Sequence, residues 1–261
     1  MAKAKPREPG GKSAAGEIQA VSRAAELLGL FGPETLELTA AEAAERLGMN
    51  RSTAYRYCTS LVATGLLDRA VDAGKFIPGK MLLQLGAFAI GRRKVMQLAP
   101  AGMQALSLST HATAVLSLWG AAGPVVSRVE ESPDSLALVT VRVGGHLPLD
   151  AAQAMIFLAF HADQLGMERL LANMAPQRRA ALLERVEHVR RTGHCSTAST
   201  PGVVAIAVPV FDEYGMCASL AVVGTDNALS QSDDAPELAM VIDTARDLTK
   251  EMGGNFVIDD L

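Results

Sequence analysis

A pair of short helices separated by a glycine turn limits the fold more than any other feature of this chain. Thr39 is followed three residues later by Glu42, the spacing at which two side chains cap a helix start reciprocally. Gly48 suits the end of this first helix, because glycine readily adopts the left-handed backbone found there. Asn50 is a good cap for a second helix that runs to about Thr64. The stretch therefore predicts a helix-turn-helix.

The second helix of the pair has two chemically different sides. At 100° per residue one side is apolar and should be buried; its members are Ala54, Tyr57, Cys58, Leu61 and Val62. The opposite side and the exposed start of the helix carry Arg51, Ser52, Tyr55, Arg56 and Thr59. Guanidinium, hydroxyl and phenol groups hydrogen-bond phosphates and base edges in DNA. We therefore predict that these five residues bind DNA, although an ordinary helical hairpin with a solvated polar face has the same pattern.

A β-hairpin is predicted directly after the second helix. Residues 66–69 and 75–77 alternate around Val71-Asp72-Ala73-Gly74, which is a turn sequence. Two helices followed by such a hairpin form a winged helix-turn-helix. We expect Arg69 and Lys75 of this wing to contact phosphates.

The segment ahead of the helix pair adds a tail and one more helix. Residues 1–15 are rich in Lys, Pro, Gly and Ala and are expected to form a disordered basic tail. A helix over residues 17–31 should follow. Its apolar, buried stripe is expected to consist of Ile18, Val21, Ala25 and Leu28. Arg23 points away from that stripe and is a further candidate for a phosphate contact, so that residues 16–78 form the predicted DNA-binding domain.

The distribution of charge supports a division of the chain. Residues 1–95 contain 14 Lys and Arg against 9 Asp and Glu, a net charge of +5. The remaining residues contain 10 against 19, a net charge of -9. A basic part joined to an acidic part implies a different kind of partner for each, and nucleic acid suits only the first.

The acidic part begins after an expected linker helix over residues 79–96. That helix carries Met81, Leu82, Leu85 and Phe88, which should be buried against a second subunit or against the rest of the chain. From residue 97 to residue 253, strand-like segments near 113–119, 125–131, 136–143, 203–211 and 219–224 are interleaved with helices near 149–162, 176–192 and 234–252. This pattern predicts an α+β sheet domain that can enclose a small-molecule pocket, followed by a C-terminal tail at 254–261.

Several classes of protein are disfavoured by the sequence. The first residues have no apolar segment typical of a secretory signal, and the longest apolar run, Ala154–Phe160, is too short to cross a bilayer. Cys58, Cys195 and Cys217 lie far apart without metal-ligand spacing. We therefore expect a cytoplasmic protein without a membrane partner, a metal or a cofactor. The chain also lacks the glycine-rich and serine motifs of nucleotide-binding proteins and hydrolases, so that an enzyme is not expected.

Taken together, these segments resemble the IclR-type transcriptional regulators. The resemblance is carried by IQAVSRAAELLGLF, LTAAEAAERLGMNRSTAYRYCTSL, FIPGKMLLQLG, GGHLPLDAA and GVVAIAVPVFDEYGMCASLAVVG, in this order. It implies a winged helix-turn-helix, a linker helix and a GAF-like α+β effector domain. It further implies dimers, often paired into tetramers, that bind palindromic operators and respond to small metabolites.

The chain departs from the family pattern where the effector should bind. The family usually has LPLHATAxGK, whereas this chain has LPLDAAQAMI, with Asp150, Met155 and Ile156 in place of His, Gly and Lys. The pocket is therefore expected to be less polar than in relatives and to take a larger, more apolar metabolite. The residues expected to line it are His146, Leu147, Ala151, Met155, His194, Cys195, Ser196, Ala205, Leu220 and Val222. The alternative is a metabolite-binding or enzymatic domain with an incidental helix-turn-helix.

Overall fold

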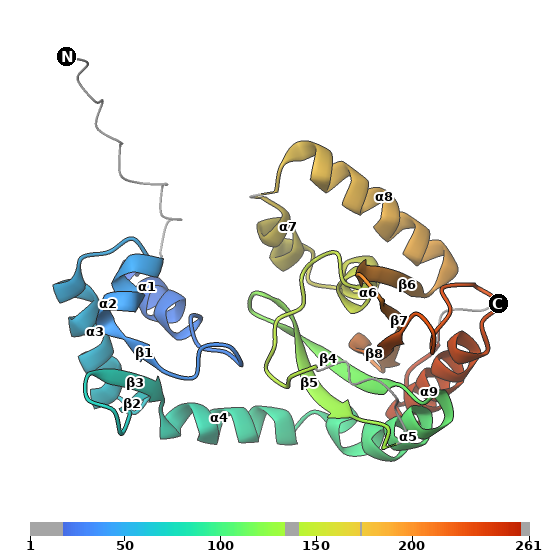
Figure 1. Cartoon of the computed structure of the whole chain (residues 1–261), viewed down its shortest axis with the longest axis horizontal. Coiled ribbons are helices and arrows are strands. Elements are labelled where there is room, and N and C mark those ends of the chain that lie inside the picture. Colours follow the sequence, from blue (N-terminus) through green and yellow to red (C-terminus); the bar gives the residue numbers. More distant parts are fainter. Residues whose placement is uncertain (1–17, 134–140, 173, 257–261) are drawn as a thin grey trace. The chain divides into compact units, whose positions relative to one another are not determined.

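The computed structural model describes residues 18–133, 141–172 and 174–256 (Figure 1). The chain divides into two compact units, Met1–Phe88 and Ala89–Leu261, here called the first and second units. The expected tail at residues 1–15, the expected strand near 136–143 for most of its length and the end of the expected tail at 254–261 lie outside the described residues.

The described residues of the first unit up to Pro78 contain three helices and a small antiparallel sheet, and most of helix α4 (Lys80–Gly91) follows them in the same unit. The helices are α1 (Gln19–Leu28), α2 (Ala40–Arg46) and α3 (Arg51–Ala63), and the strands are β1 (Leu38–Thr39), β2 (Leu67–Arg69) and β3 (Lys75–Pro78). The strand order is β1-β3-β2, so that the predicted wing hairpin carries a third strand from the segment before α2. This is a winged helix-turn-helix.

Both helix caps predicted from the sequence are present. The Thr39 hydroxyl accepts from the backbone N–H of Glu42 at 3.2 Å, and the Glu42 carboxylate accepts from the backbone N–H of Thr39 at 2.8 Å. The backbone N–H of Thr39 and then its hydroxyl, which both donate to the Glu42 carboxylate, hold the pKa of that carboxyl below its ordinary value. The Asn50 side chain accepts from the backbone N–H of Ser52 at 3.1 Å and caps α3. The local sequence thus fixes where both helices begin.

The expected buried stripe of α1 is wrong at three positions. Ile18 and Val21 are 68% and 63% exposed, and Ala25 is also exposed. Leu27 is the fully buried residue of this helix, within a core that also contains Phe76. Apolar residues lie on more than one side of α1, so their periodicity did not determine which side faces the core.

Helix α4 (Lys80–Gly91) begins at a close approach of two backbone segments. The N–H of Gly79 donates to the carbonyl of Leu66 at 2.9 Å, and the N–H of Met81 donates to the carbonyl of Gly65 at 3.0 Å. A Cβ on Gly79 would lie 2.2 Å from the Gly65 carbonyl oxygen, so that only glycine fits. The linker helix expected over residues 79–96 is interrupted at residues 92 and 93, where the chain leaves α4 before the next helix.

The second unit is a five-stranded antiparallel sheet with helices on both faces (Figure 1). Its helices are α5 (Lys94–Thr110), α6 (Ala152–Phe160), α7 (Gln164–Ala172), α8 (Pro176–Thr192) and α9 (Pro236–Met252). Its strands are β4 (Thr113–Gly120), β5 (Gly123–Glu130), β6 (Cys195–Thr200), β7 (Val203–Asp212) and β8 (Gly215–Thr225), in the order β5-β4-β8-β7-β6. The predicted α+β class is confirmed, whereas α7 and the edge strand β6 were not predicted.

Two separate apolar layers result from the alternation of side chains along the strands. One layer joins the sheet to α5 and α9 and contains Leu220 and Val222. The other joins the sheet to α6, α7 and α8 and contains Ala221, Met155 and Cys195. Nearly every side chain of α6 is buried, as expected for a helix that is apolar on all sides.

Candidate DNA-binding surface and effector cavity

Helix α3 presents a polar side to solvent and an apolar side to the core of the first unit. Ala54, Cys58 and Leu61 are buried, and Tyr57 and Val62 are half-buried, on the side that the sequence predicted. The predicted DNA-binding side of α3 faces solvent. Arg51, Ser52, Tyr55 and Arg56 are exposed and Thr59 is half-buried. The geometry is therefore that of a helix-turn-helix whose second helix is free to enter a groove.

Two hydroxyl groups on this side are already occupied by the protein. The Ser52 hydroxyl donates to the Asn50 side chain at 2.9 Å. The Thr59 hydroxyl donates to the carbonyl oxygens of Tyr55 and Arg56 at 2.9 and 3.0 Å. Their remaining capacity is to accept hydrogen bonds, whereas the guanidinium groups of Arg51 and Arg56 remain able to donate.

The candidate phosphate-binding residues differ in whether their charge is already paired. Lys75 lies 2.8 Å from the Glu37 carboxylate and 3.0 Å from that of Asp72, and these two groups, Glu37 first, raise the pKa of the ammonium. Arg23 lies 2.8 Å from Glu26. By contrast, Arg69 forms no ion pair within the described residues and holds its guanidinium 5.5 Å from the centre of the Phe76 ring. Arg69 is therefore the stronger phosphate candidate on the wing.

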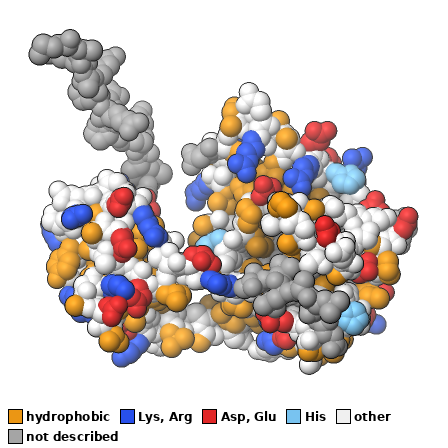
Figure 2. All heavy atoms as spheres, in the orientation of Figure 1, with side chains coloured by type: hydrophobic (Ala, Val, Ile, Leu, Met, Phe, Trp, Pro, Cys, Tyr) orange, Lys and Arg blue, Asp and Glu red, His pale blue; other side chains and the backbone are white. Residues whose placement is uncertain are grey.

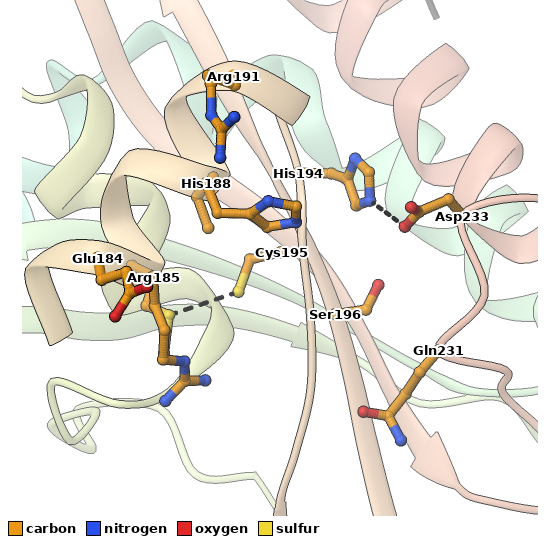
Figure 3. A pocket seen from close by; sticks show the side chains of 11 residues that line it. Glu184, Arg185, His188, Arg191, His194, Cys195, Ser196, Gln231 and Asp233 are labelled. Atoms are coloured by element: carbon orange, nitrogen blue, oxygen red, sulfur yellow. Dashed lines mark hydrogen bonds and ion pairs between the residues drawn. The ribbon is translucent and has the colours of Figure 1, made fainter. Parts of the chain in front are cut away.

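A cavity of about 470 Å³ lies in the second unit between α8 and the edge strand β6 (Figure 3). It is lined by Met155, Glu184, Arg185, His188, Val189, Arg191, His194, Cys195, Ser196, Gln231 and Asp233. The α8 side chains form one wall, and Ser196, Gln231 and Asp233 form the opposite one (Figure 3). Its volume is that of a small-molecule site.

The position of His194 in this cavity is fixed by two acceptors. Its side chain is buried, with Nε2 3.0 Å from a carboxylate oxygen of Asp233 and Nδ1 3.1 Å from the carbonyl oxygen of Thr192. Both ring nitrogens of His194 therefore face oxygen atoms, which fixes the orientation of the ring. His194 and Asp233 therefore line the cavity as a hydrogen-bonded pair.

The structure brings four of the ten expected effector-binding residues together here: Met155, His194, Cys195 and Ser196. Burial raises the pKa of the Cys195 thiol to about 11, and its sulfur lies 3.7 Å from that of Met155. This thiol is therefore an apolar wall group and not a nucleophile.

The other six expected residues lie elsewhere. Leu220 and Val222 belong to the apolar layer on the opposite face of the sheet, because the pleat turns alternate side chains of β8 to opposite sides. His146 is exposed and bridges to Val125. Leu147, Ala151 and Ala205 are half-buried and outside the cavity lining.

The start of α6 also differs from what its sequence implied. Ala151 is the N-cap residue, so that the helix expected near 149–162 begins only at Ala152, and no side chain caps it. The Asp150 carboxylate lies 3.6 Å from Arg178 of α8. The cavity lining is more polar than expected, because the side chains that α8 contributes to it were not predicted. The sequence signal for a polar wall was the high number of arginines in α8.

A winged helix-turn-helix joined to an α+β domain that holds a cavity defines a class of two-domain DNA-binding proteins. The family of the IclR helix-turn-helix domain matches residues 20–70, and the family of the bacterial transcriptional regulator IclR C-terminal domain matches residues 87–250. The chain belongs to the IclR family of transcriptional regulators, which are DNA-binding regulators and not enzymes.

Individual relatives agree with this assignment. The chain is 27% identical over 235 residues to the HTH-type transcriptional regulator XynR of Escherichia coli (strain K12), covering 85% of this chain and 90% of XynR. An IclR transcriptional regulator from Silicibacter sp. TM1040 has the same fold, with a TM-score of 0.78 at 23% identity over 90% of this chain and 97% of that one. An IclR homologue from Microbacterium hydrocarbonoxydans, complexed with 4-hydroxybenzoate, aligns with a TM-score of 0.68 at 21% identity over 89% of this chain and 98% of that one.

Neither a membrane segment nor a metal centre is found in the described part of the chain. None of its helices combines the length and the apolar character needed to span a bilayer. No cluster of three or more His, Cys, Asp or Glu side chains there could hold a metal ion.

Proposed function

We propose that this regulator binds a palindromic operator in double-stranded DNA and that a small metabolite modulates this binding. The observation that carries the proposal is the exposed side of α3, where two arginines lie opposite the buried Ala54, Cys58 and Leu61. In this arrangement Arg51, Ser52, Tyr55, Arg56 and Thr59 enter the major groove. Arg69 contacts phosphate, with smaller contributions from Arg23 and Lys75 because their charges are paired.

Self-association supplies the second recognition helix that a palindromic site requires. Helix α4 exposes large apolar side chains, including Leu83 and Phe88, whose exposed fractions are 75% and 64%. Hydrophobic side chains are visible on the surface over this helix (Figure 2). Met81, Leu85 and Ile90 are also exposed. Such a concentration of apolar surface on one helix is typical of an interface. We infer that α4 pairs with a second copy of the chain, giving a dimer or a dimer of dimers that acts in the cytoplasm.

The effector site is proposed to be the cavity between α8 and β6. Met155, Val189 and Cys195 provide apolar contacts for the body of a metabolite, although the lining as a whole is more polar than the sequence predicted. The homologue complexed with 4-hydroxybenzoate supports an aromatic or similarly sized effector. A ligand changes DNA binding only if it binds one arrangement of the two DNA-binding units more tightly than another, whatever its absolute affinity.

The proposal is tested by selecting operator DNA from genomic fragments with the purified full-length protein. We expect a retained fragment with an inverted repeat whose half-sites are separated by about one helical turn or a multiple of it. If no fragment is retained over random DNA, the alternative of a metabolite-binding protein with an incidental helix-turn-helix is favoured.

A further inference from the structure

The first turn of α3 holds one hydroxyl group in a fixed direction. The Asn50 side chain accepts from the backbone N–H of Ser52 at 3.1 Å, and only the oxygen of an amide side chain can accept, so that this hydrogen bond determines which end of the amide faces Ser52. The Ser52 hydroxyl oxygen lies 2.9 Å from the same amide oxygen. Two oxygens at that distance are held together by a hydrogen between them, and only the Ser52 hydroxyl carries one.

The hydroxyl of Ser52 therefore offers only lone pairs to a ligand. Ser52 is exposed on the same side of α3 as Arg56, and its single hydroxyl hydrogen is engaged by Asn50. Turning that hydrogen towards a ligand would leave two acceptor oxygens 2.9 Å apart with nothing between them, which is unfavourable. Phosphate oxygens also only accept, so that the Ser52 hydroxyl is a poor partner for the DNA backbone.

The major groove of DNA offers two kinds of donor to such an acceptor. They are the N4 amino group of cytosine and the N6 amino group of adenine. Guanine and thymine instead present the acceptor oxygens O6 and O4. An acceptor held at one point in the groove therefore attracts cytosine or adenine and repels guanine or thymine.

We propose that Ser52 selects cytosine or adenine at one position of each operator half-site, and that Asn50 is the positioning residue that sets this preference. The inference rests on the proposed function, in which α3 enters the major groove. The exposed arginines Arg51 and Arg56 donate hydrogen bonds and so recognise acceptors such as those of guanine. Ser52 reads the complementary class of base edge, and it adds a requirement to the operator that the arginines cannot supply.

The test begins by selecting binding sites for the full-length protein from random double-stranded DNA. We expect an enriched site in which one position of each half-site has cytosine or adenine on one strand and excludes guanine and thymine there. Enrichment of no sequence overturns the proposed function and this inference together. An enriched site without such a position overturns the inference alone.

The variant Ser52→Ala assigns that position to its side chain. The restriction should be lost there and nowhere else, so that the affinity for guanine or thymine at this position, relative to cytosine or adenine, rises about tenfold. Ser60→Ala is the matched control, because it removes another exposed hydroxyl about two turns further along α3 and should keep the restriction. Unchanged base preferences in Ser52→Ala, or the same loss in both variants, overturn the inference.

Two variants at position 50 test the positioning role. Asn50→Gly removes the acceptor but is well tolerated at a helix N-cap, so that the freed Ser52 hydroxyl can donate and the relative affinity for guanine or thymine should rise about tenfold. Asn50→Asp keeps an acceptor oxygen beside Ser52 and should retain the preference, although its negative charge weakens binding to all sequences alike. The thermal unfolding midpoint should change little in either. A preference that persists in Asn50→Gly, or is lost in Asn50→Asp, overturns the role of Asn50.

Discussion

The side-chain amide of Gln153 on α6 donates to the backbone carbonyl of Ser219 on β8 at 2.8 Å, in the middle of the buried sheet. The same amide donates to the carbonyl of Val115 at 3.2 Å, and its oxygen accepts from the Ser117 hydroxyl at 3.1 Å. One side chain thereby connects α6 to the central strand β8 and to its neighbour β4. Buried polar groups tied together in this way define one position for the helix on the sheet.

Gln153→Ala should destabilise the second unit. The substitution leaves the Ser117 hydroxyl and two carbonyl groups without their partner, at a cost of about 1–3 kcal/mol in the free energy of unfolding. Urea unfolding followed by circular dichroism measures the change. Gln177→Ala on α8 is the control, because Gln177 is exposed and its loss should have little effect. Equal stability of the two variants would contradict the role assigned to the network.

Arg56→Ala should reduce sequence preference rather than general affinity for DNA. A bidentate contact between arginine and guanine contributes about 1–3 kcal/mol of discrimination between bases. The ratio of operator to random-DNA affinity, measured by fluorescence anisotropy, should therefore fall by about tenfold or more. Arg246→Ala in the second unit is the control. An equal loss on both DNAs for Arg56→Ala would show that this side chain contacts phosphate instead.

Arg69→Ala on the wing should weaken binding to all DNA sequences alike. Its interaction with phosphate is electrostatic, so the slope of log affinity against log salt should become shallower by about 0.9 for each phosphate that is no longer neutralised, or about 1.8 for a dimer. Titrations between low and moderate salt measure this slope. An unchanged slope would remove Arg69 from the interface.

Lys75→Ala should weaken DNA binding less than Arg69→Ala does. Two carboxylates, those of Glu37 and Asp72, already pair with the Lys75 ammonium, and phosphate must compete with them. The matched comparison is Glu37→Gln, which frees part of that charge and should raise affinity for random DNA. If Lys75→Ala weakens DNA binding more than Arg69→Ala does, the ion pairs of Lys75 with Glu37 and Asp72 do not persist on DNA.

The Cys195 thiol should make the stability of the second unit depend on pH in the alkaline range. Burial raises its pKa from 9.0 to about 11 in the folded protein, whereas the unfolded chain ionises near the ordinary value. Below about pH 9 the thiol is neutral in both states and does not lower the stability. As pH rises from about 9 towards 11, the thiol ionises in the unfolded chain but not in the folded protein, so that the free energy of unfolding falls. Urea unfolding at pH 8 and pH 10 should show a smaller decrease for Cys195→Ala than for the unchanged protein.

The first unit could be predicted closely from the sequence because its signals are local. The caps at Thr39 and Asn50 and the two sides of α3 depend on residues within one or two helical turns of each other. The strand Leu38–Thr39 pairs instead with Lys75 and Phe76, more than thirty residues away, and no local pattern indicated it. The prediction placed helix α1 correctly along the chain but chose the wrong buried side, since apolar residues occur on more than one side of the helix.

The cavity was predicted only in part, because its walls come from segments that are far apart in the sequence. Its walls come from α8, β6 and the residues before α9, and the sheet order brings these segments together. The assignment of Leu220 and Val222 to the cavity failed because the face to which each side chain of β8 points depends on pairing with β7. Four expected residues do line the cavity, and they were expected from the family resemblance and not from periodicity: Met155, His194, Cys195 and Ser196.

The contact between Gly65 and Gly79 couples the direction of two helices. Gly65 follows the end of α3 and Gly79 precedes α4, and the close approach at this junction leaves no room for a side chain on Gly79. The start of α4 is therefore held against the end of α3 by backbone hydrogen bonds. An alanine side chain at position 79 would collide with the Gly65 carbonyl group and should shift the start of α4 away from the end of α3.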